Sequence, residues 1–299
     1  MAKKKPCTVN QRTIKKEKHT VPLLNIPIRL SDYAGGIFKT IPSRKGMKKA
    51  IDKGVVSVNG TRAETATLLF GGEVITLIST SKENKPILTL DLEICFENDH
   101  LAIINKPPGI LVSGNKKKTI VNALPHNLKK SSAIDALDRP KPVHRLDFPT
   151  SGLLLVAKSY SAMIALNKLF KTRSIQKTYF AITYGSLKSQ GTIQNPIDGK
   201  KAYTEYKVIK SVVSEKFEYL NLVTLFPKTG RKHQLRIHLS QINSPILGDK
   251  KYGKKEVISS GKGLYLHASK LIFKDPISNE IISVESKLPK KFTRIFDKL

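Results

Sequence analysis

From about residue 87 onward, apolar positions recur with the spacings of strands and amphipathic helices. Short apolar or alternating runs predict strands, which are Leu88–Phe96, Leu101–Ile104, Leu153–Ala157, Tyr179–Tyr184, Ala202–Ile209 and Tyr219–Leu225. One predicted helix begins at Ser159, a suitable N-cap, and ends at Lys171. Another spans Lys232–Ile242 and is stopped by Pro245. This mixture of strands and helices predicts one α+β domain over residues 87–299.

A smaller unit is predicted over residues 26–80. Ser43 is a suitable N-cap for a helix over Arg44–Lys53, and Gly54 follows where helices commonly end. The dipeptide Asn59-Gly60 is the strongest short hairpin signal in the chain. The extended runs near it are Val55–Val58 and Glu73–Ile78. A helix beside a small hairpin sheet makes this unit α+β as well.

Polar segments border the two units. The first 19 residues hold seven Lys or Arg and one acid, with little apolar periodicity. Residues 1–25 are therefore expected to be a disordered basic tail that is able to fold on a partner. Residues 81–86 (SKENKP) are polar and end in proline, as linkers do. The expected order is tail 1–25, small domain 26–80, linker 81–86 and large domain 87–299.

The net charge narrows the classes of function. The 299 residues include 53 Lys+Arg and 23 Asp+Glu, a formal net charge of +30. The positive electrostatic field of so basic a protein favours a nucleic acid, or less often an anionic membrane surface, as the partner. The longest apolar runs, such as Leu153–Ala157, are far shorter than a bilayer span, so no membrane protein is expected. The hydrophobic share of 39% is enough for real cores and excludes wholesale disorder.

Cysteine usage points to a reducing compartment. Cys7 and Cys95 are the only cysteines in the sequence, too few for a disulfide framework or a zinc site. The basic amino terminus is not followed by an apolar stretch, so no secretory signal is expected. We therefore expect a cytoplasmic protein.

The predicted helix of the small domain carries a basic face. Lys45, Lys49 and Lys53 recur at helical spacing on one side, and Arg44 and Lys48 lie beside them. Two interpretations remain open. The face is either a phosphate-binding platform for RNA or an ordinary solvated helix surface.

Two short motifs do not meet the requirements of a phosphate-binding loop or of a metal site. The segment 260–263 (SGKG) lacks the upstream Gly and the following Ser or Thr of a phosphate-binding loop. His233 and His238 are five residues apart, which places them on different faces of a helix or a strand. No shared metal ion is expected there.

The densest group of chemically versatile residues lies in Pro142–Lys158 (PVHRLDFPTSGLLLVAK). His144, Arg145 and Asp147 precede a turn, and an apolar strand follows that should hold the aspartate rigidly. Nearby cations favour an ionised carboxylate, which can act as a nucleophile, a base or a metal ligand. Ser151 does not complete a hydrolase triad, because no GxSxG turn is present. From the residues alone, a structural aspartate that caps the turn and pairs with Arg145 remains open.

Short blocks of sequence follow one another in a characteristic order. They are NKPPGILV (105–112), HRLDFPTSG (144–152), KTY (177–179), TGRKHQLRIH (229–238), GD (248–249) with YG (252–253), and LHA (266–268). Together they resemble the RluA/RluD-type family of RNA pseudouridine synthases, over roughly residues 86–275. This resemblance implies a catalytic α+β fold with a mixed, mainly antiparallel sheet, flanking helices and a central cleft.

The resemblance also implies a reaction. Uridine is isomerised after it is flipped out of its stack, by breaking the bond between uracil and ribose and rejoining the base through carbon 5. Asp147 is then the essential carboxylate, Tyr179 lies against the flipped uracil, and Arg236 pairs with the aspartate. Nothing is oxidised or hydrolysed, so no cofactor or metal is expected.

Further residues are expected at the RNA. Arg231 competes with Arg236 for the pairing role. The resemblance places Arg145 in the gap left by the flipped base, His144 against the RNA nearby, and Leu266 in the apolar wall under the base. The block 115–130, with five lysines, is interpreted as a phosphate-holding loop over the cleft, or as a plain solvated loop.

The small domain is similar to the RNA-binding domain named after ribosomal protein S-four. The matching positions are Arg29-Leu30, Ser43-Arg44, Gly54, Val58-Asn59-Gly60 and Gly72-Glu73. Two departures are present. Gly35-Gly36 falls where the first helix of such domains is usually helix-forming, and Glu73 stands where aspartate is usual.

The expected partner is structured RNA. By family analogy it is large-subunit ribosomal RNA, within a precursor of the ribosomal large subunit. A tRNA pseudouridine synthase and a non-catalytic RNA-binding or ribosome-assembly protein are the alternatives. A monomer is expected, because so large a surface of like charge opposes self-association.

Overall fold

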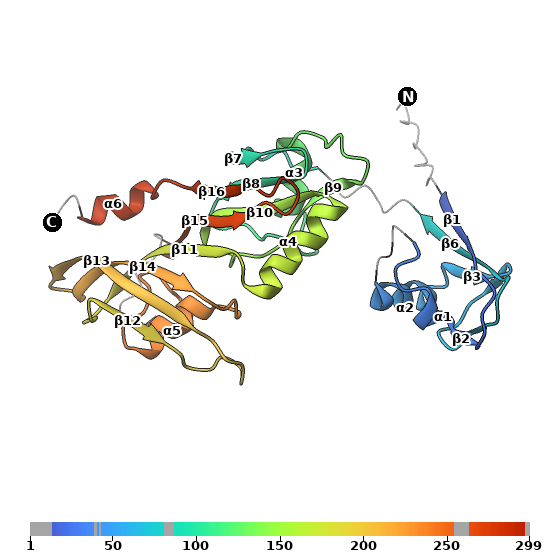
Figure 1. The fold of residues 1–299 in the computed structure, drawn as a ribbon. Helices are drawn as coiled ribbons and strands as arrows, with labels where there is room; N and C mark the ends of the chain where they lie inside the picture. The colour runs from blue at the N-terminus through green and yellow to red at the C-terminus, as the bar shows by residue number, and fades with distance from the viewer. Residues whose placement is uncertain (1–13, 39–40, 42, 81–86, 254–262, 297–299) are drawn as a thin grey trace, which may run out of the picture. The chain divides into compact units, whose positions relative to one another are not determined.

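The computed structural model describes residues 14–38, 41, 43–80, 87–253 and 263–296. The chain divides into two compact units, residues 1–85 and 86–299 (Figure 1). The predicted linker 81–86 lies outside the described residues, as do the first thirteen residues of the predicted tail. Within the part of the chain that the structure describes, no helix is both long enough and apolar enough to cross a bilayer.

The first unit is built on a four-stranded antiparallel sheet in the order β1-β6-β3-β4, beside a two-stranded pair of β2 with β5. Its elements are β1 Ile14–Thr20, β2 Ile28–Arg29, α1 Leu30–Tyr33, α2 Arg44–Asp52, β3 Val56–Val58, β4 Thr61–Arg62, β5 Leu68–Leu69 and β6 Val74–Thr80. Side chains from both helices and from the strands enclose one apolar core, which includes Leu30, Met47, Leu69 and Ile75.

The predicted disorder of residues 1–25 is wrong from residue 14 onward. β1 pairs along its whole length with β6, from Ile14 opposite Thr80 to Thr20 opposite Val74, and Val21 is buried in the core. The strand was hard to recognise because it lies at the sheet edge, where charged residues such as lysine are tolerated and discourage pairing with other chains.

The helix and the hairpin expected in this unit are confirmed. The Ser43 hydroxyl caps α2 by accepting a hydrogen bond from the backbone N–H of Gly46 (3.2 Å). Asn59 and Gly60 adopt φ values of 49° and 83°, the left-handed pair that a tight hairpin turn needs. Helix α1 ends after one turn, just before Gly35, which accords with the poor helix propensity of the glycine pair.

The second unit is built on a ten-stranded sheet with mainly antiparallel pairs, as expected for the large domain. Strands follow the order β12-β13-β14-β11-β15-β10-β8-β7, while β16 pairs with β15 and β9 pairs with β10. The strands are β7 Glu93–Glu97, β8 Leu101–Lys106, β9 Ala136–Pro142, β10 Ser151–Ser159, β11 Gln176–Tyr184, β12 Gln190–Ile193, β13 Thr204–Ser214, β14 Glu218–Pro227, β15 Leu266–Lys274 and β16 Ile281–Glu285. The helices are α3 Ile120–Asn127, α4 Tyr160–Thr172, α5 Gln234–Gln241 and α6 Lys290–Phe296.

Helices cover the sheet and close separate apolar clusters. Side chains of α5 and α6 pack on β11, β13 and β14, those of α3 pack on β8 and β10, and those of α4 pack on the other side of β8 and β10 (Figure 1). The predicted helices of this unit are confirmed as α4 and α5. The predicted strand Leu88–Phe96 begins only at Glu93.

The interpretation of residues 115–130 as one loop is wrong. Thr119 caps α3, and Ile120 and Leu124 are fully buried. The sequence pattern does not indicate this helix, because the helix is short and contains Pro125. Lysines flank the helix on both sides and are exposed, namely Lys116, Lys117, Lys118, Lys129 and Lys130.

A close approach of two parallel strands fixes the start of β10. Gly152 pairs with Ala268 of β15 and has a φ of 114°. A Cβ atom at this position would lie 2.2 Å from the carbonyl oxygen of Ala268. Glycine alone permits both the backbone conformation and the contact. The segment just before β10 is therefore anchored where it enters the core.

A buried lysine also anchors the segment that leads into β10. The Nζ atom of Lys106, at the end of β8, donates hydrogen bonds to the backbone oxygens of Pro107 (2.8 Å), Phe148 (3.3 Å) and Thr150 (2.8 Å). All three ammonium donors thus have partners in a site with no solvent exposure. Burial lowers the pKa of Lys106 to about 8, although the nearby Asp147 acts in the opposite direction.

We expect Gly152→Ala to lower the free energy of unfolding by about 3 kcal/mol or more, because strain at positive φ adds to the overlap with Ala268. Gly199 is the matched control, since its φ is 69° but no atom lies within 4 Å of an added Cβ. Gly199→Ala should cost about 1 kcal/mol. Urea unfolding of the full chain measures both, and equal losses would contradict the role of the close approach.

We also expect a pH-dependent contribution from Lys106. Its pKa is about 8 in the folded chain against an ordinary 10.5, so the unfolded chain binds more protons between these values. The free energy of unfolding should therefore rise with pH across that window, and Lys106→Met should remove this part of the rise. Lys188→Met, at an exposed site, is the control. Identical pH slopes for wild type and Lys106→Met would overturn the expectation.

Candidate active site

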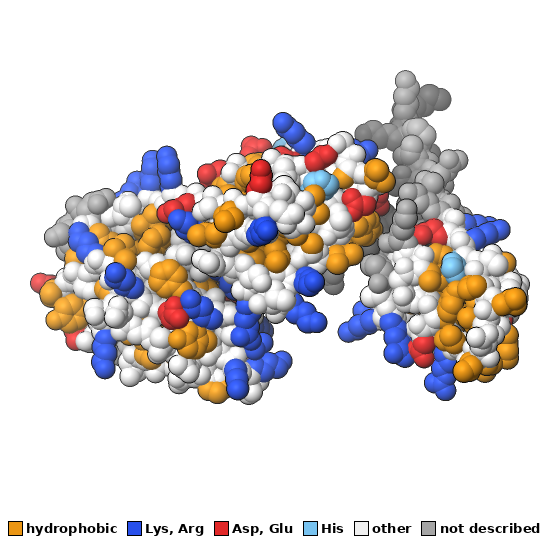
Figure 2. Space-filling view, in the orientation of Figure 1, with side chains coloured by type: hydrophobic (Ala, Val, Ile, Leu, Met, Phe, Trp, Pro, Cys, Tyr) orange, Lys and Arg blue, Asp and Glu red, His pale blue; other side chains and the backbone are white. Residues whose placement is uncertain are grey.

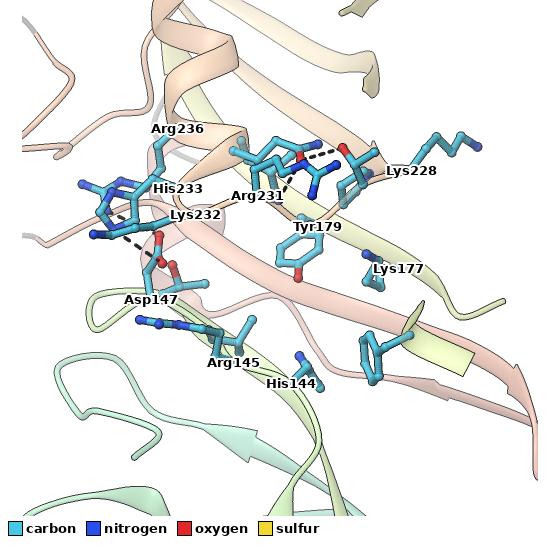
Figure 3. A pocket seen from close by; sticks show the side chains of 18 of the residues that line it. His144, Arg145, Asp147, Lys177, Tyr179, Lys228, Arg231, Lys232, His233 and Arg236 are labelled. Atoms are coloured by element: carbon cyan, nitrogen blue, oxygen red, sulfur yellow. Dashed lines mark hydrogen bonds and ion pairs between the residues drawn. The ribbon is translucent and has the colours of Figure 1, made fainter. Parts of the chain in front are cut away.

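A pocket of about 540 Å³ lies in the second unit and is lined mainly by three segments of chain, together with the end of α4 and Leu266 of β15 (Figure 3). One segment is 143–150, just before β10, and another is the start of β11. The third is 227–236, which connects β14 to α5. Because the outer two segments lie far apart in the sequence, the pocket is a product of the sheet topology.

The charge of the lining is one-sided. Among the described residues that line the pocket, Asp147 is the only acid. The Lys and Arg residues of the lining are Arg145, Lys171, Arg173, Lys177, Lys228, Arg231, Lys232 and Arg236. On the face shown in Figure 2, Lys and Arg side chains gather beside the lower end of α4. The pocket is suited to a polyanion and holds a single carboxylate.

Asp147 lies at the base of the turn that leads into β10, with its side chain 17% exposed. The turn is closed by a hydrogen bond from the backbone N–H of Thr150 to the backbone oxygen of Asp147 (3.1 Å). One carboxylate oxygen, Oδ2, lies 3.4 Å from Nη1 of Arg236, and the other, Oδ1, lies 3.7 Å from Nε2 of His233. Figure 3 shows both partners on the same side of the aspartate.

Arg236 is held by a second, fully buried carboxylate. Its Nε and Nη2 donate to the two oxygens of Asp249 at 2.7 and 2.8 Å, a bidentate pair. Burial alone would lower the pKa of Arg236, but this pair and Asp147 raise it. Burial alone would likewise raise the pKa of Asp249, yet the hydrogen bonds from Arg236 and from the backbone N–H groups of Lys251 and Tyr252 lower it.

Tyr179 projects from β11 into the pocket, and its hydroxyl points to the space between Asp147 and Lys177 (Figure 3). Burial, reinforced by the charge of Asp147, raises the pKa of the phenol, so Tyr179 is neutral. The ring also packs against the apolar clusters on both sides of it. Tyr179 therefore lines the pocket while part of its ring belongs to the core.

His144 lines the pocket but its Nε2 already has a partner within the protein. Nε2 accepts a hydrogen bond from the backbone N–H of Leu155 (2.9 Å), and the ring stacks on Phe170 with 4.8 Å between centroids. Burial, with a contribution from Lys177, lowers the pKa of His144 to about 3, so the ring is neutral. This histidine ties the Asp147 segment to β10, and its contact with RNA stays a prediction.

The other residues predicted in this unit also line the pocket. Arg145 is exposed at its edge, and Leu266 of β15 forms part of its wall. Arg231 donates from Nε to the backbone oxygen of Lys201 (3.0 Å). The partner of Asp147 is thus Arg236, and the competing candidate Arg231 binds elsewhere.

The predicted basic face in the first unit is present on α2. Met47, Ala50 and Ile51 point into the core of that unit, so the lysines face solvent. The exposed lysines are Lys45, Lys48, Lys49 and Lys53. Arg44 pairs with Asp32 of α1, and it is also exposed.

The site shows no side chains arranged for a metal ion. Among the described residues, no three His, Cys, Asp or Glu side chains gather closely enough to hold one. His238 is buried away from His233, with its ring nitrogens at Thr204 (2.9 Å) and the backbone oxygen of Asn195 (3.1 Å).

Sequence reasoning missed the groups that support the site. Lys106, Asp249 and Tyr252 each lie in one of the sequence blocks described above, yet only folding shows what they touch. The signal for Asp249 was the GD and YG pairs at 248–253. Glycine is required at position 253, since a Cβ atom there would lie 2.5 Å from the backbone oxygen of Asp249.

The chain is similar to known proteins along most of its length. The sequence profile described as RNA pseudouridylate synthase matches residues 100–241. Ribosomal large subunit pseudouridine synthase C of Rickettsia prowazekii (strain Madrid E) is 36% identical, over 90% of this chain and 96% of that protein. Ribosomal large subunit pseudouridine synthase D of Nitrosomonas europaea is 34% identical, over 83% of this chain and 77% of that protein.

Solved structures agree with the sequence matches. Human RNA pseudouridylate synthase domain containing 4 aligns with a TM-score of 0.55 and 28% identity, covering 69% of this chain and 92% of that chain. The profile match spans the Asp147 segment, Tyr179 and Arg236, all of which line the pocket. The chain belongs to the RluA/RluD-type RNA pseudouridine synthases and is an isomerase that acts on uridine in RNA.

Proposed function

We propose that this enzyme converts uridines of large-subunit ribosomal RNA to pseudouridine, with Asp147 as the essential carboxylate and the target nucleotide flipped into the pocket. The observation that carries the proposal is the placement of Asp147 as the only acid among eight Lys and Arg residues of the described lining. The relatives from Rickettsia and Nitrosomonas are named for the ribosomal large subunit, which supports the choice of RNA.

The chemistry rearranges one nucleotide without a net change of atoms. The bond between uracil N1 and ribose C1′ breaks and a bond between C5 and C1′ forms, so the proton lost from C5 is balanced by one gained at N1. A uracil stacked in a helix is out of reach, and flipping it costs a few kcal/mol. Phosphate contacts from the cations of the lining offset this cost.

The pocket offers a distinct surface to each part of a flipped uridine. The neutral Tyr179 supplies an aromatic face, and stacking of a base on such a face contributes about 1–3 kcal/mol. Leu266 adds an apolar wall, and we propose that Arg145, which is exposed at the edge of the pocket, occupies the space that the base leaves in the RNA. Asp147, paired with Arg236, then faces the nucleotide within the same pocket.

We propose that the first unit is an RNA-binding domain of the S-four type whose α2 lysines contact phosphates. Three exposed lysines lie in the nine-residue helix α2 and a fourth, Lys53, directly follows it, whereas the helix holds one acid, Asp52. Contacts of this kind are independent of base sequence, so they add affinity and orient the enzyme on structured RNA.

We expect Asp147→Asn to abolish isomerisation and to leave RNA affinity within a few-fold of wild type, because the carboxylate acts on the nucleotide and contributes little to phosphate binding. Asp138→Asn, at an exposed site on β9, is the control and should retain activity. A large loss of affinity with Asp147→Asn would favour a structural role for the aspartate.

The substrate is tested by mapping pseudouridines as carbodiimide adducts in total RNA from cells with and without the gene. Sites lost from large-subunit rRNA should return with the wild-type gene and stay absent with Asp147→Asn. Sites lost from tRNA alone would overturn the proposed substrate while leaving the chemistry in place. No lost site in an expressing cell would favour a binding role.

We expect the combined change of Lys45, Lys48, Lys49 and Lys53 to Gln to weaken RNA binding and to reduce its salt dependence. The log–log slope should fall by about one unit for each phosphate that is no longer neutralised. Binding is measured by titrating the full chain with a large-subunit rRNA transcript at several salt concentrations. The same change at the exposed Lys188, Lys216 and Lys274 of the second unit is the control. An unchanged slope for the α2 variant would contradict the RNA-binding role.

A further inference from the structure

Tyr252 contacts both residues that hold Asp147. Its hydroxyl lies 2.9 Å from Nδ1 of His233, and the guanidinium carbon of Arg236 lies 5.1 Å from the centroid of its ring. Tyr252 does not line the pocket, whereas His233 and Arg236 do. Tyr252 therefore contacts His233 and Arg236 from outside the pocket, while these two residues face the carboxylate of Asp147.

The hydrogen bond between the Tyr252 hydroxyl and Nδ1 of His233 is linked to the position of the proton on the imidazole. A neutral imidazole has one N–H donor and one acceptor nitrogen, and an ionised carboxylate only accepts. With Nε2 3.7 Å from Oδ1 of Asp147, a bare nitrogen at this position would face a negative charge. The favourable arrangement has the Tyr252 hydroxyl donating to Nδ1 and the Nε2–H directed at Asp147.

Burial and the nearby cations favour the neutral form of His233. Burial lowers its pKa, the nearby Asp147 acts in the opposite direction, and Arg236 lowers it further. Lys251 and Lys232 also lower the pKa. A neutral imidazole can donate from one nitrogen only, so the partner of Nδ1 decides whether the donor faces the aspartate.

The backbone of His233 adopts a left-handed conformation. His233 has a φ of 56° and immediately precedes α5, a conformation that costs of order 1–3 kcal/mol outside glycine and that marks functional sites. The side chain of Gln234 supports it by accepting from Thr229 (2.6 Å) and from the backbone N–H of Arg231 (3.0 Å). His233 is thus held out of the helix toward the pocket.

The residue that touches His233 comes from a rigid turn. The Asp249 carboxylate accepts hydrogen bonds from the backbone N–H groups of Lys251 (2.9 Å) and Tyr252 (3.1 Å), and the N–H of Gly253 donates to the backbone oxygen of Asp249 (2.9 Å). The same turn therefore presents a carboxylate to Arg236 and a phenol to His233.

We propose that Tyr252 is a positioning residue that fixes the Nε2–H tautomer of His233, so that His233 and Arg236 each direct one donor at a different oxygen of Asp147. Two donors on two oxygens fix both the position and the plane of the carboxylate before the substrate binds. A group oriented in advance loses no time or free energy to reorganisation during reaction. This inference rests on the proposed role of Asp147.

The activity test uses the full chain with Tyr252→Phe, His233→Asn and the double variant. Phenylalanine keeps a ring under Arg236 and removes only the hydroxyl, and asparagine tolerates the positive φ of His233. We expect Tyr252→Phe to lower kcat on a large-subunit rRNA transcript about tenfold, the effect of roughly one hydrogen bond, with KM and RNA affinity unchanged. The double variant should be no slower than His233→Asn, because the Tyr252 hydroxyl acts only through the ring of His233.

Tyr219→Phe is the matched control, since Tyr219 lies on the surface of β14 and outside the pocket. It should have the kcat of wild type. Wild-type kcat in Tyr252→Phe, or losses that simply add in the double variant, would overturn the inference.

A measurement without RNA tests the tautomer directly. In ¹⁵N spectra of histidine-labelled protein, His233 should carry its proton on Nε2 at neutral pH, and Tyr252→Phe should raise the pKa of this ring because the donor that stabilises the neutral form is removed. A proton on Nδ1 in the wild type would overturn the inference whatever the activity. An inactive wild-type enzyme on the transcript would count against the proposed substrate alone, because the spectra still decide the tautomer.

Discussion

A buried ion pair between Arg236 and Asp249 sets the geometry of the site. Removing either charge from water costs several kcal/mol, and a single missing partner would leave the other charge uncompensated. Asp249 meets this demand with two guanidinium donors and two backbone N–H groups. The arginine is thereby locked in one orientation, in which its remaining nitrogen, Nη1, faces Asp147.

Asp147 itself lies where two independently anchored parts of the second unit meet. On one side, Lys106 and Gly152 fix the segment that enters β10, through backbone hydrogen bonds and through close packing on β15. On the other side, the turn 249–253 and the start of α5 present Arg236 and His233. Each part is held by several hydrogen bonds from within the protein, so the distance between carboxylate and cation depends on the sheet that joins the two parts.

The electrostatic asymmetry of the pocket links affinity to chemistry. Eight Lys and Arg residues of the described lining repel one another in the free enzyme, and a polyanionic backbone relieves that repulsion. The single carboxylate contributes nothing to phosphate binding, and its two oxygens lie 3.4 Å from Nη1 of Arg236 and 3.7 Å from Nε2 of His233. Neutral Tyr179 and neutral His144 complete the lining, since burial disfavours the charged form of each.

The sequence by itself determined the elements whose signals are local, together with several residues of the pocket. The α2 cap at Ser43, the hairpin at Asn59-Gly60 and helices α4 and α5 follow from neighbouring residues, and the motif blocks identified Asp147, Tyr179 and Arg236. Only the tertiary structure decided that residues from 14 onward form an edge strand and that residues 120–127 are a buried helix. It also decided that Lys106, Asp249 and Tyr252 support the site. The reason is physical: a strand edge, a buried charge and a hydroxyl acquire their meaning from partners that lie far away in the sequence.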